Sequence, residues 1–244
     1  MTKMYEADTH ILIHTNHLMP GLHCHKAAHI IVCLEGNMTV TSDSQEYPCQ
    51  GIMIPSGIRH RVDTHSHSVL VFLFNSTTTV SMQMQDTSIL SENTCNFIKA
   101  TYSEMEKSGS IEQYNIFVNS VMNALGFTRI NSCITDPRIS SAVEHIRSRL
   151  SENITCQEIA TSVFLSEGRF SHLFKQQVGM TFASYLIYQR ILYVYTKILG
   201  GISITEAAIS AGFSGSSHFA DVNRRVFGLP ATTITRDMEF IKVH

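Results

Sequence analysis

The first 75 residues of the chain contain short apolar runs that are separated by turn residues. Two such runs occupy residues 30–34 and 69–74, and a shorter run follows the first one at 38–41, after the turn Glu35-Gly36-Asn37. Short β-branched runs at this spacing are typical of a β-sandwich or a small barrel. We therefore expect the chain to begin with a domain built from short strands.

The pattern becomes helical beyond residue 89. Apolar side chains recur there at three- and four-residue spacing up to about residue 127, and a break at Ser108-Gly109-Ser110 predicts two separate helices. Residues 128–137 are expected to form a linker, because Pro137 disfavours helix at Asp136. From Pro137 onward every periodic segment is helical up to the last few residues. We thus expect an α+β chain in three parts, residues 1–85, 86–136 and 137–244.

The third part contains a pair of short helices. Thr155 and Glu158 have the spacing of a capping box, and Ser166 is suited to cap the helix that follows. One face of that second helix is apolar, and its other face carries small, cationic or hydrogen-bonding side chains. This arrangement predicts a helix-turn-helix, although any packed helical pair can give the same pattern.

The pattern recurs from Ser203, after a long apolar segment between Thr181 and Leu199 that is expected to be a rigid spacer helix. The motifs of the two halves, in chain order, are Glu158-Ile159-Ala160, Leu165-Ser166, Phe170 to Lys175, Gly179 to Phe182, Tyr185-Leu186 and Arg190, then Ser203-Ile204, Ala208, Gly212-Phe213, His218-Phe219 and Phe227-Gly228. Together they resemble the DNA-binding domain of the AraC/XylS family over about residues 140–236. Three positions depart from the family pattern: Asn223 replaces a usual phenylalanine, Pro230 comes one residue early, and Thr235 replaces a common arginine.

The family resemblance implies two recognition helices that enter successive major grooves of DNA. Base-reading positions of the first helix hold Gly168, Ser171 and His172, and those of the second hold Ser216, Ser217, His218, Ala220 and Asp221. Positions suited to phosphate contacts, which fix register without conveying sequence, hold Arg169, Lys175, Arg224 and Arg225. The alternative for each of these arginines is a solvated surface charge.

Histidines gather in the first part of the chain. His23 and His25 lie on one face of a strand, because side chains alternate along a strand. With His29, Gly36 and the later Pro55-Ser56-Gly57-Ile58-Arg59-His60, they resemble the two sequence motifs of the cupin fold. The resemblance implies a cupin-like β-barrel in which His23, His25, His29 and His60 converge.

Four imidazoles would suit a divalent zinc, nickel, copper or iron ion. The alternative is a pocket that binds an organic effector through hydrogen bonds from the same histidines. The remaining histidines of this part are expected at the surface or in loops: His10, His14, His17, His65 and His67.

Charge is unevenly distributed. The net charge of the chain is −2, but residues 1–136 carry 7 basic against 12 acidic side chains, and residues 137–244 carry 11 against 8. Only the second part is therefore suited to a polyanion such as DNA. Six scattered cysteines without a Cys-x-x-Cys pair indicate reduced thiols. The sequence has no signal peptide pattern and no membrane-length apolar run, so we expect a cytoplasmic protein.

Three classes of function fit these observations. The first is a transcription regulator, and the family resemblance implies that it activates transcription. In this class residues 1–85 form a cupin-like sensor barrel, residues 86–136 a helical dimerisation or linker region, and residues 137–244 the DNA-binding domain. Its expected partners are promoter DNA, RNA polymerase, a metal or small-molecule effector and a second copy of the chain. The second class is a metal-dependent cupin enzyme, and the third is a protein-interaction module with weakened DNA binding. We favour the regulator, which is not an enzyme, because the enzyme class leaves the paired helical units without a purpose. The departures in the second unit keep the interaction-module class open.

Overall fold

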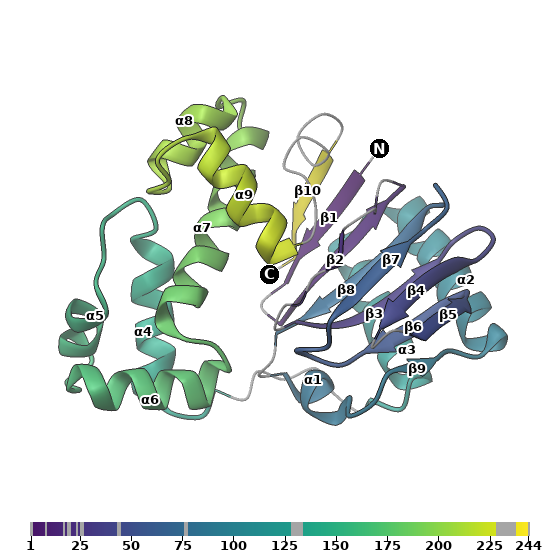
Figure 1. Cartoon of the computed structure of the whole chain (residues 1–244), viewed down its shortest axis with the longest axis horizontal. Coiled ribbons are helices and arrows are strands. Elements are labelled where there is room, and N and C mark those ends of the chain that lie inside the picture. Colours follow the sequence, from purple (N-terminus) through teal and green to yellow (C-terminus); the bar gives the residue numbers. More distant parts are fainter. Residues whose placement is uncertain are drawn as a thin grey trace. The chain divides into compact units, whose positions relative to one another are not determined.

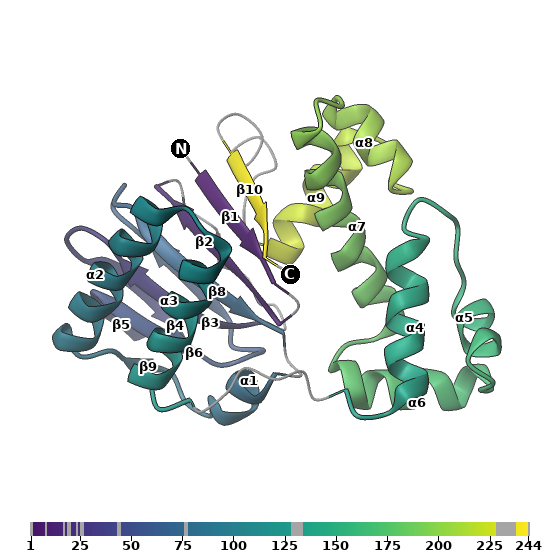
Figure 2. The same cartoon turned by 180° about the vertical axis from the view of Figure 1, so that it is seen from behind.

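The structure is a computed structural model of the 244-residue chain, shown from two opposite sides in Figures 1 and 2. It describes residues 2–7, 9–16, 18, 21–22, 24, 27–42, 45–75, 78–127, 134–227 and 238–243. The chain divides into two compact units. Residues 1–132 together with 237–244 form the sheet unit, and residues 133–236 form the helical unit.

The sheet unit contains two sheets. The larger has the strand order β10-β1-β2-β8-β3-β6-β9, and the smaller has the order β5-β4-β7. Neighbouring strands are antiparallel except for β1 and β10, which run parallel. The strands are β1 (Thr2–Glu6), β2 (His10–Thr15), β3 (Ala28–Cys33), β4 (Met38–Ser42), β5 (Gln45–Cys49), β6 (Gly51–Ile54), β7 (His60–Asp63), β8 (Val69–Phe74), β9 (Ser88–Ile89) and β10 (Met238–Lys242).

The centre of the larger sheet is formed by β3 and β8. Every residue of both strands is buried, and Ile30 of β3 lies opposite Phe72 of β8. A strand covered on both faces needs a continuous apolar run instead of an alternating one. That requirement explains the unbroken runs at 30–34 and 69–74 in the sequence.

Two long helices cover one face of the larger sheet (Figure 2). They are α2 (Glu92–Ser108) and α3 (Ile111–Ala124), and a short helix α1 (Thr79–Gln83) precedes them. Gly109 ends α2 with a φ of 65°, and the Ser110 side chain caps α3 by accepting from the amide of Gln113 at 3.2 Å. Their apolar stripes share one core with the strands; the rings of Phe117 and Phe72, for example, lie 5.9 Å apart. The segment 86–136 is therefore not the separate region that the sequence led us to expect, because α2 and α3 are packed into the sheet unit.

The last strand also differs from expectation. The sequence predicts one DNA-binding domain over residues 137–244, but β10 returns to the sheet unit and pairs with β1, with Ile241 opposite Tyr5. Beyond β10, the amide of Val243 donates to the carbonyl oxygen of Glu6 at 2.9 Å. The physical reason is that β10 brings Ile241 and Val243 into the apolar core at the edge of the sheet. The sheet unit therefore contains both ends of the chain, and the helical unit lies between them in sequence.

The helical unit consists of α4 (Pro137–Ser148), α5 (Cys156–Ser162), α6 (Glu167–Val178), α7 (Phe182–Leu199), α8 (Ile204–Ser210) and α9 (Ser216–Phe227). Asp136 caps α4 and Pro137 occupies its first turn, where a missing amide hydrogen has no cost. Its first half has its own core, centred on Phe170 and Phe174, whose ring centroids lie 5.2 Å apart. Among the helices that the structure describes, none has the length and apolar character to span a membrane.

Candidate nucleic-acid interface

The first helix-turn-helix is formed by α5 and α6, and its ends are fixed by side-chain caps. Thr155 Oγ1 accepts from the Glu158 amide at 3.2 Å, and Glu158 Oε2 accepts from the Thr155 amide at 2.7 Å. These hydrogen bonds to the carboxylate hold the pKa of Glu158 below its ordinary value. Ser166 caps α6 by accepting from the Arg169 amide at 3.4 Å. The predicted capping box and the predicted start of α6 are both confirmed.

The outer face of α6 carries the first set of predicted DNA contacts. The side chains of Phe170, Leu173, Phe174 and Val178 are buried. All five predicted contact positions are instead exposed: Gly168, Arg169, Ser171, His172 and Lys175. The Ser171 hydroxyl lies 3.3 Å from Cys156 Sγ of α5, so it also contacts the preceding helix. The helix therefore presents one polar surface, as a groove-reading helix requires.

The second helix-turn-helix is formed by α8 and α9. Ser203 caps α8, and the positions predicted to face DNA on α9 are exposed or half-buried: Ser216, Ser217, His218, Ala220, Asp221, Arg224 and Arg225. His218 has a local role as well, because its Nδ1 lies 3.2 Å from the Ser214 amide nitrogen and accepts its hydrogen. Only Nε2 of this ring is then left for a base or a phosphate.

The charges on the two outer faces are similar. The exposed charged side chains of α6 are Glu167, Arg169 and Lys175. Those of α9 are Asp221, Arg224 and Arg225. The charged side chains of each helix therefore sum to +1. This positive charge favours binding to a polyanion, and it is small enough that contacts with bases can still determine which sequence is bound.

Sequence reasoning missed one feature, in the turn of the first helix-turn-helix. Phe164 has a φ of 59° and its side chain is 95% exposed. The matching position of the second unit is Gly212, with a φ of 81°. The two turns are equivalent, because Leu165 donates to the Ala160 carbonyl at 2.9 Å and Phe213 donates to the Ala208 carbonyl at 3.0 Å. Glycine adopts this conformation without strain and phenylalanine does not. The signal was present in the sequence as Phe164 and Gly212 at the same distance after Ala160 and Ala208.

The departure at Asn223 has a structural explanation. Asn223 is fully buried in α9, and its side-chain oxygen accepts a hydrogen bond from the hydroxyl of Tyr195 on α7. Tyr195 is fully buried too, and burial raises the pKa of its hydroxyl well above the ordinary value. A buried amide and a buried phenol thus satisfy each other where the family places an apolar ring. The second unit is packed without that ring.

Arg190 of α7 contacts both halves of the helical unit. Its Nη2 donates to the carbonyl oxygen of Glu152, which precedes α5, at 2.7 Å. Its guanidinium also lies against Gly212, where an added Cβ would be 3.0 Å from Arg190 Cζ. The positive φ of Gly212 favours glycine at this position, and a larger residue there would also displace the end of the Arg190 side chain. From α7, the Arg190 side chain therefore contacts both the segment before the first helix-turn-helix and the turn of the second one.

The histidines of the sheet unit are only partly placed together. His29 and His60 are both buried, their ring centroids lie 4.9 Å apart, and His60 Nδ1 lies 2.9 Å from the carbonyl oxygen of Ile58. His23 and His25 lie outside the described residues. Within the part of the chain that is described, no group of three or more histidine, cysteine or carboxylate side chains is arranged to hold a metal.

Two other histidines differ from expectation. His10 and His14 lie in β2 and not in loops. His10 is 4% exposed, its Nε2 lies 2.8 Å from the Tyr114 hydroxyl, and burial lowers its pKa to about 4. His14 is half-buried beside Tyr102 and Glu106, and burial lowers its pKa despite the nearby carboxylate. Both are covered because α2 and α3 lie over this strand.

Comparison with known proteins supports this assignment of the helical unit. A family model described as a helix-turn-helix domain matches residues 159–237. The regulatory protein PocR of Salmonella typhimurium is 30% identical over 93 residues, which are 38% of this chain and 31% of that protein. The HTH-type transcriptional regulator ArgR of Pseudomonas aeruginosa is 28% identical over 94 residues, which are 38% of this chain and 29% of that protein. The matched segment thus spans about a third of the length of these curated relatives.

The complete fold also has solved counterparts. The crystal structure of ToxT from Vibrio cholerae O395 covers 97% of this chain and 98% of its own, with a TM-score of 0.57 and 14% identity. A second ToxT structure, described as bound to an unsaturated fatty acid, covers 94% of this chain and 96% of its own, with a TM-score of 0.55 and 14% identity. At this identity the likeness establishes the arrangement of a sheet-rich region followed by helices. The helical unit of this chain therefore contains a helix-turn-helix domain, and it resembles the DNA-binding domain of the AraC/XylS family.

Proposed function

We propose that the protein is a sequence-specific DNA-binding transcription regulator whose helical unit binds a promoter and whose sheet unit receives an effector. The observation that carries this proposal is the pair of helix-turn-helix units, each with a polar outer face and buried apolar side chains on the opposite face of its second helix. The relatives named above are described as regulators. Neither that description nor the fold favours the alternative of a cupin enzyme.

The length of the helix that joins the two units is comparable to the groove repeat of a DNA duplex. The units are joined by α7, which has 18 residues and is therefore about 27 Å long at the usual rise per residue. Successive major grooves on one face of B-DNA are about 34 Å apart. We infer that α6 and α9 enter adjacent grooves, with Arg169, Lys175, Arg224 and Arg225 on phosphates. Ser171, His172, Ser217 and His218 then lie nearest to the base edges.

The test is fluorescence anisotropy of the full chain with a labelled duplex from upstream of its own gene. A scrambled duplex of the same length is the control. We expect tighter binding to the upstream duplex, with an advantage that persists as salt is raised, because base contacts depend less on counterion release than phosphate contacts do. Equal affinity for the two duplexes would contradict sequence-specific binding. No binding at all would favour the interaction-module alternative.

The effector of the sheet unit is either an organic molecule or a metal ion. The closeness of the buried His29 and His60 rings supports a metal ion. With His23 and His25 these residues would form a set of imidazole ligands for zinc, nickel, copper or iron. Elemental analysis of tag-free protein, grown with these metals, tests the proposal. We expect one metal per chain that is lost in His29→Ala and His60→Ala and kept in His65→Ala. If the wild-type protein contains no metal, the metal proposal is wrong and an organic molecule is the remaining candidate for the effector.

We further propose that the regulator is a homodimer that contacts RNA polymerase as an activator in the cytoplasm. Support for the dimer comes from apolar side chains that α2 and α3 leave exposed: Phe97, Ile111 and Ile116. Light scattering of the full chain at tens of micromolar, in wild type and in Phe97→Ser with Ile116→Ser, tests this. We expect a dimer that the double substitution dissociates, whereas a monomeric wild type would contradict the proposal.

A further inference from the structure

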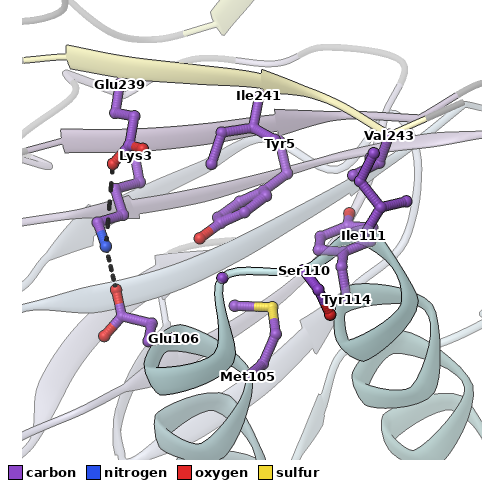
Figure 3. A pocket seen from close by; sticks show the side chains of 11 residues that line it. Lys3, Tyr5, Met105, Glu106, Ser110, Ile111, Tyr114, Glu239, Ile241 and Val243 are labelled. Atoms are coloured by element: carbon purple, nitrogen blue, oxygen red, sulfur yellow. Dashed lines mark ion pairs between the residues drawn. The ribbon is translucent and has the colours of Figure 1, made fainter.

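A pocket opens in the sheet unit between β1, β10 and the turn that joins α2 to α3 (Figure 3). Its volume is about 150 Å³, which is the size of a cavity that holds one benzene ring. Polar and apolar atoms contribute about equally to its walls. The apolar part is formed by Tyr5 of β1, Met105 of α2, Ile111 of α3, Ile241 of β10 and Val243 just beyond β10. The pocket can therefore take the apolar body of a small molecule.

Charged groups lie on one side of this pocket. Lys3 Nζ is 2.9 Å from Glu106 Oε1 and 3.9 Å from Glu239 Oε2, as the dashed lines in Figure 3 show. Burial alone raises the pKa of Glu106, but hydrogen bonds from Lys3 and Tyr102 outweigh it and hold the pKa below its ordinary value. Among the described residues, the carboxylates of Glu106 and Glu239 share the ammonium group of Lys3 at this site. These three side chains carry a net charge of −1.

The wall opposite these charges is aromatic and held in place by neighbours. The Tyr5 and Tyr114 rings are stacked with centroids 5.0 Å apart. Behind them, the Tyr114 hydroxyl lies 2.8 Å from Nε2 of the buried His10. A ring or a cationic group can be placed against such a wall without a large rearrangement, and cations are attracted to aromatic faces.

We infer that this pocket binds a small amphipathic amine, with its apolar body against Tyr5, Ile111 and Ile241 and its ammonium group toward Glu239 and Glu106. A carboxylate ligand fits the site less well, because Lys3 is already paired with Glu106 and a second anion would approach Glu239. A neutral ligand of the same shape would fill the apolar part and leave the excess charge without a partner.

A ligand bound in this pocket would stabilise the pairing of β10 with the rest of the sheet unit. The ligand would contact β10 through Ile241 and β1 through Tyr5 at the same time, so its binding energy favours the state in which these strands are paired. Because β10 follows the DNA-binding helices in the chain, its attachment restrains the far end of the helical unit. This regulatory consequence rests on the proposed function, whereas the binding of the amine does not.

Titration calorimetry of the full chain with three probes of one shape tests the ligand class. The probes are 2-phenylethylamine, 2-phenylethanol and phenylacetate, which are cationic, neutral and anionic at neutral pH. We expect the amine to bind about fivefold more tightly than the alcohol, a ratio in the range of a solvent-accessible ion pair, and phenylacetate to bind most weakly. Any other order, or no heat with all three at millimolar concentration, would overturn the proposal.

Two surface substitutions locate the site. Glu239→Gln removes the excess charge at the pocket and should bring the amine to the affinity of the alcohol. Glu104→Gln removes an exposed carboxylate from the same helix as Glu106, outside the pocket, and should leave the affinity unchanged. Equal effects of the two substitutions would show that the amine responds to overall charge and would overturn the assignment.

Hydrogen exchange provides a readout that is independent of DNA. We expect the amine to slow exchange of the backbone amides of residues 238–242, and unchanged exchange with bound amine would overturn the role given to β10. DNA affinity is then measured with and without the amine. If the chain binds no DNA, the proposed function fails while the calorimetric result stands. If the chain binds DNA but calorimetry detects no binding of the amine, only the pocket assignment fails.

Discussion

Tyr195 of α7 donates a hydrogen bond to the side-chain oxygen of Asn223 of α9, and both side chains are completely buried. The pair joins the spacer helix to the second recognition helix at a depth where most side chains are apolar. A hydrogen bond in such surroundings specifies one packing, because any shift of α9 along α7 separates the two polar groups. The orientation of α9 relative to α7 is therefore fixed by a hydrogen bond as well as by apolar packing.

We predict that this pair is energetically coupled. Asn223→Leu removes the acceptor of the Tyr195 hydroxyl and should lower the free energy of unfolding by about 1–3 kcal/mol, the usual cost of removing one partner of a buried hydrogen bond. Tyr195→Phe should cost a similar amount. The double variant should lose clearly less than the sum, because neither polar group is then present. Urea denaturation of the four proteins measures the coupling, and strictly additive losses would contradict it.

The turn at Phe164 offers a test of backbone strain. A left-handed conformation costs a residue with a Cβ about 1–2 kcal/mol relative to glycine. Phe164→Gly should therefore be more stable than Phe164→Ala by about 1 kcal/mol, although both remove the same exposed ring. Thermal unfolding of the two variants and the wild type measures the difference. If Phe164→Ala is as stable as Phe164→Gly, the turn is not strained in solution.

The helical unit could be predicted in detail because its signals are local. The capping box at Thr155 and Glu158, the cap at Ser166 and the apolar stripes of α6 and α9 each depend on residues a few positions apart. The exposure of His172 and Lys175 follows from the same periodicity. Local patterns were enough to predict which face of each of these helices is exposed and which is buried.

The sheet unit could be predicted only in part because its arrangement depends on distant contacts. The strand runs at 30–34 and 69–74 were visible, but β10 pairs with a strand at the other end of the chain, and no local pattern identifies that partner. The pocket lined by Lys3, Glu106 and Glu239 exists only once this pairing has formed. The sequence predicts His10 at the surface, whereas its burial comes from α3, which supplies Tyr114 from far along the chain.

Substitutions on the two recognition helices should separate affinity from specificity. Lys175→Ala and Arg224→Ala are expected to weaken binding to every duplex and to reduce the slope of log affinity against log salt by about 0.9 for each phosphate that is no longer bound. His172→Ala should change which duplex is preferred, with a smaller effect on the salt slope. Anisotropy titrations over a range of salt concentrations measure both quantities. The placement of these helices in the groove is wrong if neither affinity nor salt slope responds to any of the three.

The buried His10 should make the stability of the sheet unit depend on pH. Burial lowers the pKa of His10 to about 4 from its ordinary value of 6.5. Between these values the unfolded chain binds a proton at this residue and the folded chain does not. The free energy of unfolding therefore rises with pH across this window, and it falls as the pH drops from 6.5 toward 4, by up to about 1.4 kcal/mol per pH unit.

His10→Gln removes this proton-binding site, and the measurement is the slope of unfolding free energy against pH between 4 and 6.5. The variant is expected to be less stable than the wild type at neutral pH, because it disturbs the contact of His10 with the Tyr114 hydroxyl. Its acid slope should nevertheless be smaller, and His65→Gln at an exposed position serves as the control. His14, whose pKa burial also lowers, would retain part of the pH dependence in the variant. Identical slopes in wild type and His10→Gln would show that His10 is protonated in the folded state, and that the α3 helix does not exclude water from it.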